Sequence, residues 1–177
     1  NDNIFIGYAS GTSTTTGNDN VFIGSFSGYT NQTGENNTGV GYATLYYATG
    51  SYNSAMGYEA GKNLSTGAKN TFLGNLAGTY VSTGDDNTII GHNAGNALTN
   101  GNANINVGAF AGKYSNLSNR LFINSIDRLT AAGDTTKSII YGYMDADETL
   151  QRLTVNGIFD AHNIETNTTR STRLGYE

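Results

Sequence analysis

The 177-residue chain contains no cysteine, no proline and no tryptophan, and only 13% of its residues are charged. Without cysteine, no disulfide can hold a small fold together. An average chain of this length would hold roughly nine prolines, and each proline removes a hydrogen-bond donor from any sheet that contains it. The absence of proline therefore favours a structure in which backbone N–H groups bond to neighbouring strands throughout.

Charge and hydrophobicity exclude further classes of protein. The net charge is −5, and acidic and basic residues are dispersed without a basic stripe, so nucleic acid is not an expected partner. No apolar run reaches the ~18 residues of a membrane span, so we expect no membrane insertion. No signal peptide opens the chain, and because Asn1 falls at a repeat boundary we expect a fragment of a longer protein.

Glycine is abundant, with 24 residues, and seven of these glycines mark a repeat. They are spaced by 17, 17, 16, 17, 17 and 17 residues, at Gly7, Gly24, Gly41, Gly57, Gly74, Gly91 and Gly108. A unit this short cannot bury its own apolar face and must stack on its neighbours. Low-complexity disorder is the alternative, but disorder does not keep one position apolar and another small in seven successive copies.

Each unit carries up to three glycines together with Asn, Thr and Ser, a composition that excludes helix. Short β-rich runs, such as Ile4 to Ile6 and Thr88 to Ile90, lie between an asparagine and the marker glycine. We therefore predict an all-β protein whose residues 1–119 form a repetitive β-roll (solenoid) of seven coils of about 17 residues. Each coil has room for two short strands and two turns.

The two faces of the predicted strands are both apolar. We expect the residue before each marker glycine to fill the inside of the roll, opposite a column of small residues. The inside set is Ile6, Ile23, Val40, Met56, Leu73, Ile90 and Val107, and the small set is Ser10, Ser27, Thr44, Ala60, Ala77, Ala94 and Ala111. The preceding residue then points outward, which makes Phe5, Phe22, Phe72 and Ile89 the candidate interface with further copies of the chain around a closed symmetry axis.

Each unit opens with asparagine and most units close with Thr-Gly. Asparagine side chains bond to turn backbone and stack into ladders, and glycine supplies the positive φ of turns. We interpret these positions as scaffold; the alternative is a regular ladder that binds a ligand.

The pattern Asn-x-x-Ile/Leu-Gly-x-x-Ala-Gly at Asn70 to Gly78 and Asn87 to Gly95 resembles two families of repeats. One is the head domain of bacterial trimeric autotransporter adhesins, and the other is the longer repeat of phage tail fibres and related bacterial tail-fibre-domain proteins. The adhesin heads imply a left-handed roll, a homotrimer in which each chain meets two identical chains, and an extracellular binding role. The length of the coil fits the tail fibres better.

The repeat stops after Ser118, and arginine first appears there, at Arg120. Runs at 121–123, 139–144 and 150–155 predict strands, and Asn156-Gly157 predicts a hairpin. We expect residues 120–177 to form a β-rich capping and connecting region that covers the open end of the roll. The segment Leu153 to Gly157 is similar to one found just before the C-terminal region of many tail fibres.

Nothing in the chain predicts catalysis, a metal site or a cofactor. Asp85-Asp86 falls in a turn, and we interpret Asp145, Asp147 and Glu148 as a loop; the alternative is a calcium site. His92 and His162 have no second nitrogen or sulfur ligand at metal spacing. We therefore expect a non-enzymatic protein.

Tyrosines are the candidate ligand-binding residues, because their rings stack on sugars and their hydroxyls form hydrogen bonds. The candidates lie in the variable half of the coil, at Tyr29, Tyr46, Tyr47, Tyr52, Tyr80 and Tyr114. Among these, the tyrosines of the third repeat are the leading candidates, because this repeat is one residue short and has Leu45 in place of its second glycine. Alternatively, these rings only pack along the outside of the coil.

The hypothesis from sequence is a structural and host-surface-binding segment of a trimeric tail fibre on an extracellular phage or phage-like particle. Its partners would be two identical chains and a host cell-surface glycan or protein. The alternatives are a bacterial trimeric surface adhesin head, a glycan-cleaving tailspike, and ice binding by a threonine-rich face that includes Thr12 and Thr14 to Thr16.

Overall fold

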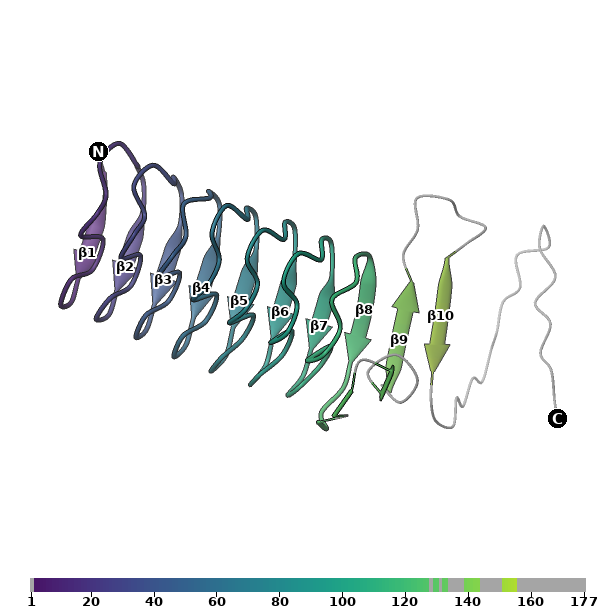
Figure 1. Ribbon diagram of the computed structural model, residues 1–177. Coiled ribbons are helices and arrows are strands. Elements are labelled where there is room, and N and C mark those ends of the chain that lie inside the picture. The colour runs from purple at the N-terminus through teal and green to yellow at the C-terminus, as the bar shows by residue number, and fades with distance from the viewer. Residues whose placement is uncertain (1, 128, 131, 134–138, 144–150, 156–177) are drawn as a thin grey trace, which may run out of the picture.

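The computed structural model describes residues 2–127, 129–130, 132–133, 139–143 and 151–155. These residues form one sheet of ten strands that lie side by side in chain order (Figure 1). The strands are β1 (Ile4–Ile6), β2 (Val21–Ile23), β3 (Thr38–Val40), β4 (Ser54–Met56), β5 (Thr71–Leu73), β6 (Thr88–Ile90), β7 (Ile105–Val107), β8 (Arg120–Ile123), β9 (Ile140–Tyr143) and β10 (Arg152–Val155). The predicted all-β solenoid of about seven turns of roughly 17 residues is confirmed.

The first eight strands pair in parallel, each with the strand of the next coil. Equivalent residues face each other, so Phe5 lies opposite Phe22 and Phe72 opposite Ile89. The short third repeat keeps this register, since Gly39 lies opposite Ala55. Residues at the same place in successive coils therefore form straight columns along the stack.

Each coil contributes one strand to the sheet, so the expectation of two strands per coil is wrong. The rest of the coil is a series of turns, because four positions of the coil hold residues with positive φ, and only two of these positions are usually glycine. Examples are Phe26, at 59°, and Tyr52, at 64°. Such residues interrupt an extended backbone. The turns still form hydrogen bonds with the next coil; for example, the backbone N–H of Tyr47 donates to the carbonyl of Lys62 at 3.1 Å.

The assignment of the two strand faces is also wrong. Phe22, Phe72 and Ile89 are at most 1% exposed and lie inside the coil, whereas Met56, which was expected inside, is 52% exposed. In a strand of three residues only the middle side chain points inward and its two neighbours point outward. The candidate interface residues Phe22, Phe72 and Ile89 are therefore core, and Phe5 belongs to the same inner column, where its ring stacks on Phe22 at 5.7 Å.

The second glycine of each coil explains why large residues fit inside. A Cβ atom at Gly28 would lie 2.3 Å from the ring of Phe22, and one at Gly78 would lie 2.4 Å from the ring of Phe72. In the third coil the sizes are exchanged, because Gly39 occupies the strand and the buried Leu45 occupies the place of the second glycine. The two columns are therefore complementary in size.

The opening asparagines form a buried ladder, which supports their interpretation as scaffold. Asn70 donates from Nδ2 to the carbonyl of Gly84 at 2.8 Å and to Oδ1 of Asn53 at 3.1 Å. Its own Oδ1 accepts the backbone N–H of Asn87 at 3.0 Å. Similar bonds to the backbone N–H of the next coil join Asn3, Asn20, Asn37, Asn53, Asn70, Asn87, Asn104 and Arg120.

The sheet continues beyond residue 119. Strand β8 adds to the parallel stack, and β9 and β10 then extend the same sheet in antiparallel fashion. The ring of Tyr141 lies 5.2 Å from that of Phe122, and the Arg120 guanidinium lies 4.2 Å from the centre of the Tyr143 ring. The three strands expected after the repeats are thus present, and the hairpin expected at 156–157 lies outside the described residues.

Candidate functional site

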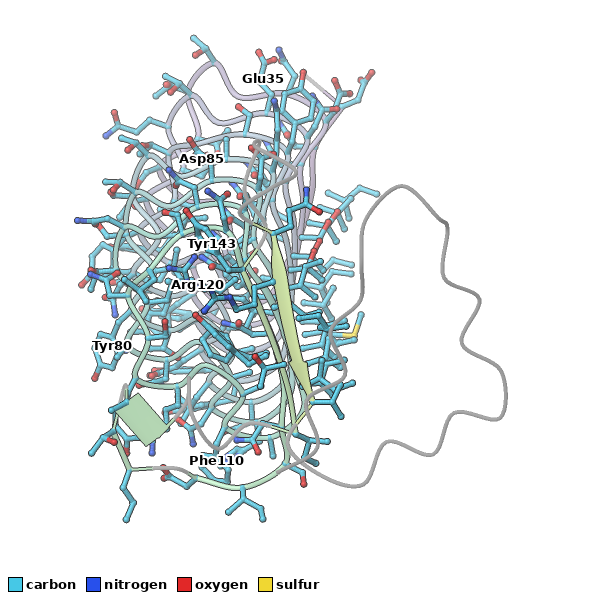
Figure 2. All side chains as sticks on the ribbon, turned by 90° about the vertical axis from the view of Figure 1, so that its right-hand side faces the viewer. Glu35, Tyr80, Asp85, Phe110, Arg120 and Tyr143 are labelled. Carbon is cyan, nitrogen blue, oxygen red and sulfur yellow. The ribbon has the colours of Figure 1, made fainter. Side chains whose placement is uncertain are left out.

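The outer side of the sheet carries an apolar column of side chains that runs along the eight parallel strands. This column, which we call the outer column, is apolar in all eight parallel strands: Ile6, Ile23, Val40, Met56, Leu73, Ile90, Val107 and Ile123. Side chains project from this side of the sheet away from the coil (Figure 2). Large exposed apolar surfaces mark sites of interaction.

A shallow groove of about 160 Å³ interrupts the outer face between β3 and β5. Met56 and Leu73 flank it, and the shorter side chains of Thr38, Ser54 and Thr71 leave it open.

A second surface feature is a cluster of seven aromatic rings on the first four coils, which we call the aromatic ridge. It consists of Tyr8, Phe26, Tyr29, Tyr42, Tyr46, Tyr47 and Tyr58. Successive ring centres lie 4.5 to 6.0 Å apart, and two pairs are stacked: Tyr29 with Tyr46 at 4.9 Å and Tyr42 with Tyr58 at 5.4 Å.

The ridge turns the corner that follows each strand. Backbone hydrogen bonds show which residues are equivalent at this corner. The N–H of Phe26 donates to the carbonyl of Tyr8, and the N–H of Phe110 donates in the same way to the carbonyl of His92. Phe110 therefore marks the column of Phe26, and Tyr80 lies at the equivalent place to Tyr47 two coils away. Figure 2 shows Phe110 at this corner and Tyr80 on the side of the coil away from the sheet.

An ion pair borders the ridge. Lys62 Nζ lies 2.8 Å from Glu59 Oε1, and both side chains are partly buried. The hydrogen bond to Glu59 raises the pKa of Lys62. The negative charge of Glu59 likewise raises the pKa of Tyr58, and partial burial and the neighbouring Tyr29 raise that of Tyr46. The charges and phenols therefore act on one another as one cluster.

The structure brings together only some of the predicted tyrosines. Tyr29, Tyr46 and Tyr47 lie in the ridge. Tyr52 lies at the corner before the strand, immediately before the ladder residue Asn53, and Tyr80 lies farther along the stack. Sequence reasoning missed Tyr8, Phe26, Tyr42 and Tyr58 as members of a site, although the repeat spacing places Tyr8, Tyr42 and Tyr58 in one column.

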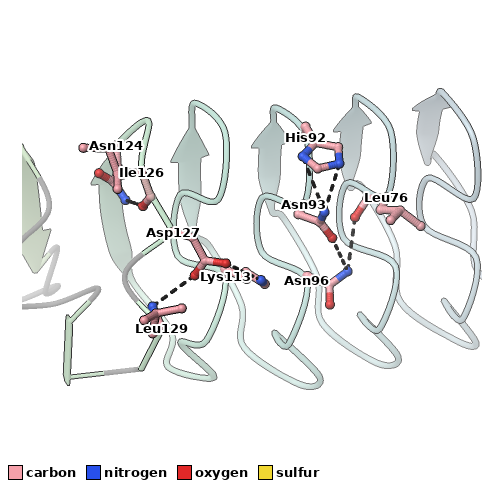
Figure 3. A network of polar contacts seen from close by, with 9 residues as sticks. All are labelled: Leu76, His92, Asn93, Asn96, Lys113, Asn124, Ile126, Asp127 and Leu129. Atoms are coloured by element: carbon pink, nitrogen blue, oxygen red, sulfur yellow. Dashed lines mark hydrogen bonds and ion pairs between the residues drawn. The ribbon is translucent and has the colours of Figure 1, made fainter.

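Tyr114, the sixth candidate, belongs to a separate cluster at the far end of the stack. Lys113 Nζ lies 4.8 Å from the centre of its ring, 5.1 Å from that of Phe110 and 2.6 Å from Asp127 Oδ2. The hydrogen bond between Lys113 and Asp127 raises the pKa of the lysine and lowers that of the aspartate. Figure 3 shows the Lys113–Asp127 pair and, on the neighbouring coil, the contacts of His92 with Asn93.

Comparison with models of protein families, with curated proteins and with solved structures found no match to this chain.

The acidic residues considered for catalysis have structural contacts where they are described. Asp85 accepts the backbone N–H of Ala68 at 2.8 Å and donates its own N–H to Asn102 Oδ1 at 2.8 Å, so it bridges coils at an exposed corner (Figure 2). Asp145, Asp147, Glu148 and His162 lie outside the described residues. Among the residues that the structure describes, no three His, Cys, Asp or Glu side chains are grouped for a metal.

No helix in the described part of the chain has the length and apolar character to span a membrane.

Proposed function

We propose that this chain is a non-enzymatic segment of a homotrimeric tail fibre of a phage or phage-like particle. In this role it is a rigid spacer and contacts the host cell surface. The observation that carries the proposal is the apolar outer column, which extends along a stack of coils that are bonded to one another over their whole length.

Rigidity is supported by three sets of bonds between neighbouring coils. Strands of neighbouring coils pair in parallel, and the asparagine side chains accept hydrogen bonds from backbone N–H groups of the next coil. Turn residues also bond to the next coil; for example, the backbone N–H of Thr30 donates to the carbonyl of Tyr46 at 2.9 Å. Because these hydrogen bonds recur at several places in every coil, bending the stack breaks many of them at once. A fibre shaft requires this stiffness.

Association of three chains is supported by the composition of the outer face. Met56, Leu73 and Ile6 are exposed in the single chain, and their burial would remove apolar surface from water. Copies arranged around an axis parallel to the stack would bring the same columns together in every chain. The number three comes from the resemblance of the repeats to trimeric families.

Immunogold electron microscopy tests the fibre assignment. Antibodies raised against residues 1–177 are applied to particles and to whole cells of the producing culture, and antibodies absorbed with the purified chain are the control. We expect gold on slender fibres attached to particles. Gold confined to the cell envelope would overturn the proposal in favour of a surface adhesin.

A further inference from the structure

We propose that the aromatic ridge is a binding site for a neutral carbohydrate. The phenol rings would lie against the apolar C–H faces of pyranose units, while Glu59 and Lys62 would form hydrogen bonds with the sugar hydroxyls. This inference rests on the host-binding role proposed above, for which it names the ligand class and the residues.

The solenoid backbone does not require rings at the positions of the ridge. The same columns hold smaller or polar residues in other coils, namely Ser25, Asn75 and Ala109 in the column of Tyr42, and Thr12, Thr79 and Asn96 in the column of Tyr46. The coils without these rings have the same fold as the coils of the ridge, and their backbones form the same kinds of hydrogen bonds with neighbouring coils. The gathering of seven rings on four adjacent coils is thus a local addition to the repeat.

The rings remain accessible within the cluster. Tyr8 is 74% exposed, and Tyr42, Tyr47 and Tyr58 are each nearly half exposed. Each accessible tyrosine offers apolar carbon surface together with a hydroxyl, the combination that suits an amphipathic ligand. A pyranose ring has one apolar face and a rim of hydroxyls, so it matches both parts of the surface.

The charges on the ridge favour a neutral ligand. Lys62 is held by Glu59 at 2.8 Å, so the pair has no net charge. An acidic sugar would approach the Glu59 carboxylate without a free cation to balance it. A bulky apolar partner would remove the ion pair from water at a free-energy cost. Sugar hydroxyls avoid both costs, because they can donate to the carboxylate and accept from the ammonium group.

Affinity electrophoresis provides the test. The purified chain is run in native gels that contain dextran, yeast mannan or galactomannan, with polygalacturonate as the acidic comparison. We expect at least one neutral polymer to retard the chain. Tyr47→Ala should weaken this retardation about tenfold, because it removes a major ring surface, and Glu59→Gln should weaken it several-fold.

Tyr80→Ala is the matched control, because Tyr80 occupies the column of Tyr47 and is similarly exposed, at 55% against 48%. The variant should bind as the parent does. Circular dichroism of all variants establishes that the fold is kept. The inference is overturned if no neutral polymer retards the chain, if polygalacturonate retards it equally, or if Tyr80→Ala weakens binding as much as Tyr47→Ala. These outcomes leave the fibre labelling unaffected, so the two proposals can fail separately.

Discussion

At the scale of single residues, the buried asparagines carry much of the specificity of the stack. Each side chain both donates and accepts, so it satisfies a closing carbonyl in its own unit and a backbone N–H in the next coil. No other side chain of this size offers both groups at a fixed angle. Buried polar groups stabilise a fold only when their bonds are complete, and in the ladder they are.

Asn70→Ala should therefore be strongly destabilising. The change leaves the Gly84 carbonyl and the Asn87 N–H without their partners inside the coil, at a cost of about 2–4 kcal/mol in the free energy of unfolding. Urea denaturation followed by circular dichroism measures this cost. Asn75→Ala, at an exposed site on the next turn, should change stability by less than about 0.5 kcal/mol. Equal effects of the two changes would contradict the role of the ladder.

Residue patterns predicted the ladder but could not decide which strand face is inside. Both faces carry large apolar residues, as Phe72 and Leu73 illustrate, so alternation alone is ambiguous. The signal that resolves the faces is the relation between two columns. In coils whose strand contains Phe22 or Phe72, the place of the coil's second glycine is occupied by glycine. In the coil whose strand contains Gly39, that place is occupied by Leu45. Such compensation occurs between residues that touch.

At the scale of the coil, this compensation makes the third repeat a rearranged core. Leu45 is fully buried and adopts a positive φ of 49°, as do the glycines at the equivalent place. The coil therefore keeps its path while a side chain from the turn replaces one from the strand. The irregularity of this repeat in the sequence reflects packing inside the coil, and its external tyrosines are a separate feature.

Moving this arrangement to the fifth coil tests the idea. Phe72→Gly alone leaves a cavity and should cost about 3–5 kcal/mol. Gly78→Leu alone forces a side chain against the Phe72 ring, since even a Cβ atom at this position would lie 2.4 Å from the ring; this change should cost about 1–3 kcal/mol. The loss in free energy of unfolding of the double variant should be smaller than the summed losses of the two single variants, by at least about 1 kcal/mol. Thermal or urea unfolding of the four chains provides the cycle, and simple additivity would show that the two columns do not share one space.

The aromatic ridge could be predicted only in part, because most of its rings come from different coils and meet only when the coils stack. Tyr46 and Tyr47 attract notice as neighbours in sequence, whereas Tyr8, Tyr42 and Tyr58 are separated by one or two units. Stacking of equivalent residues at the coil spacing brings them together. Glu59 and Lys62 join them because the same corner presents both side chains.

At the scale of the whole molecule, we propose that other copies of the chain cover the outer face of the sheet. The outer column is apolar in every parallel strand, although its position on the outside requires no apolar residue for the fold of one coil. Large exposed apolar surfaces mark sites of interaction. The outer column contains no charged residue, which fits a surface selected for association.

Molar mass in dilute solution tests this claim most directly, measured by sedimentation velocity on the parent chain and on the double variant Met56→Glu, Leu73→Glu. Both changes lie on the outer face and leave the interior of the coil untouched, so the variant should retain its circular dichroism spectrum. We expect the mass of three chains for the parent and of one chain for the variant. A folded parent that sediments as a single chain of 18.7 kDa would contradict the account.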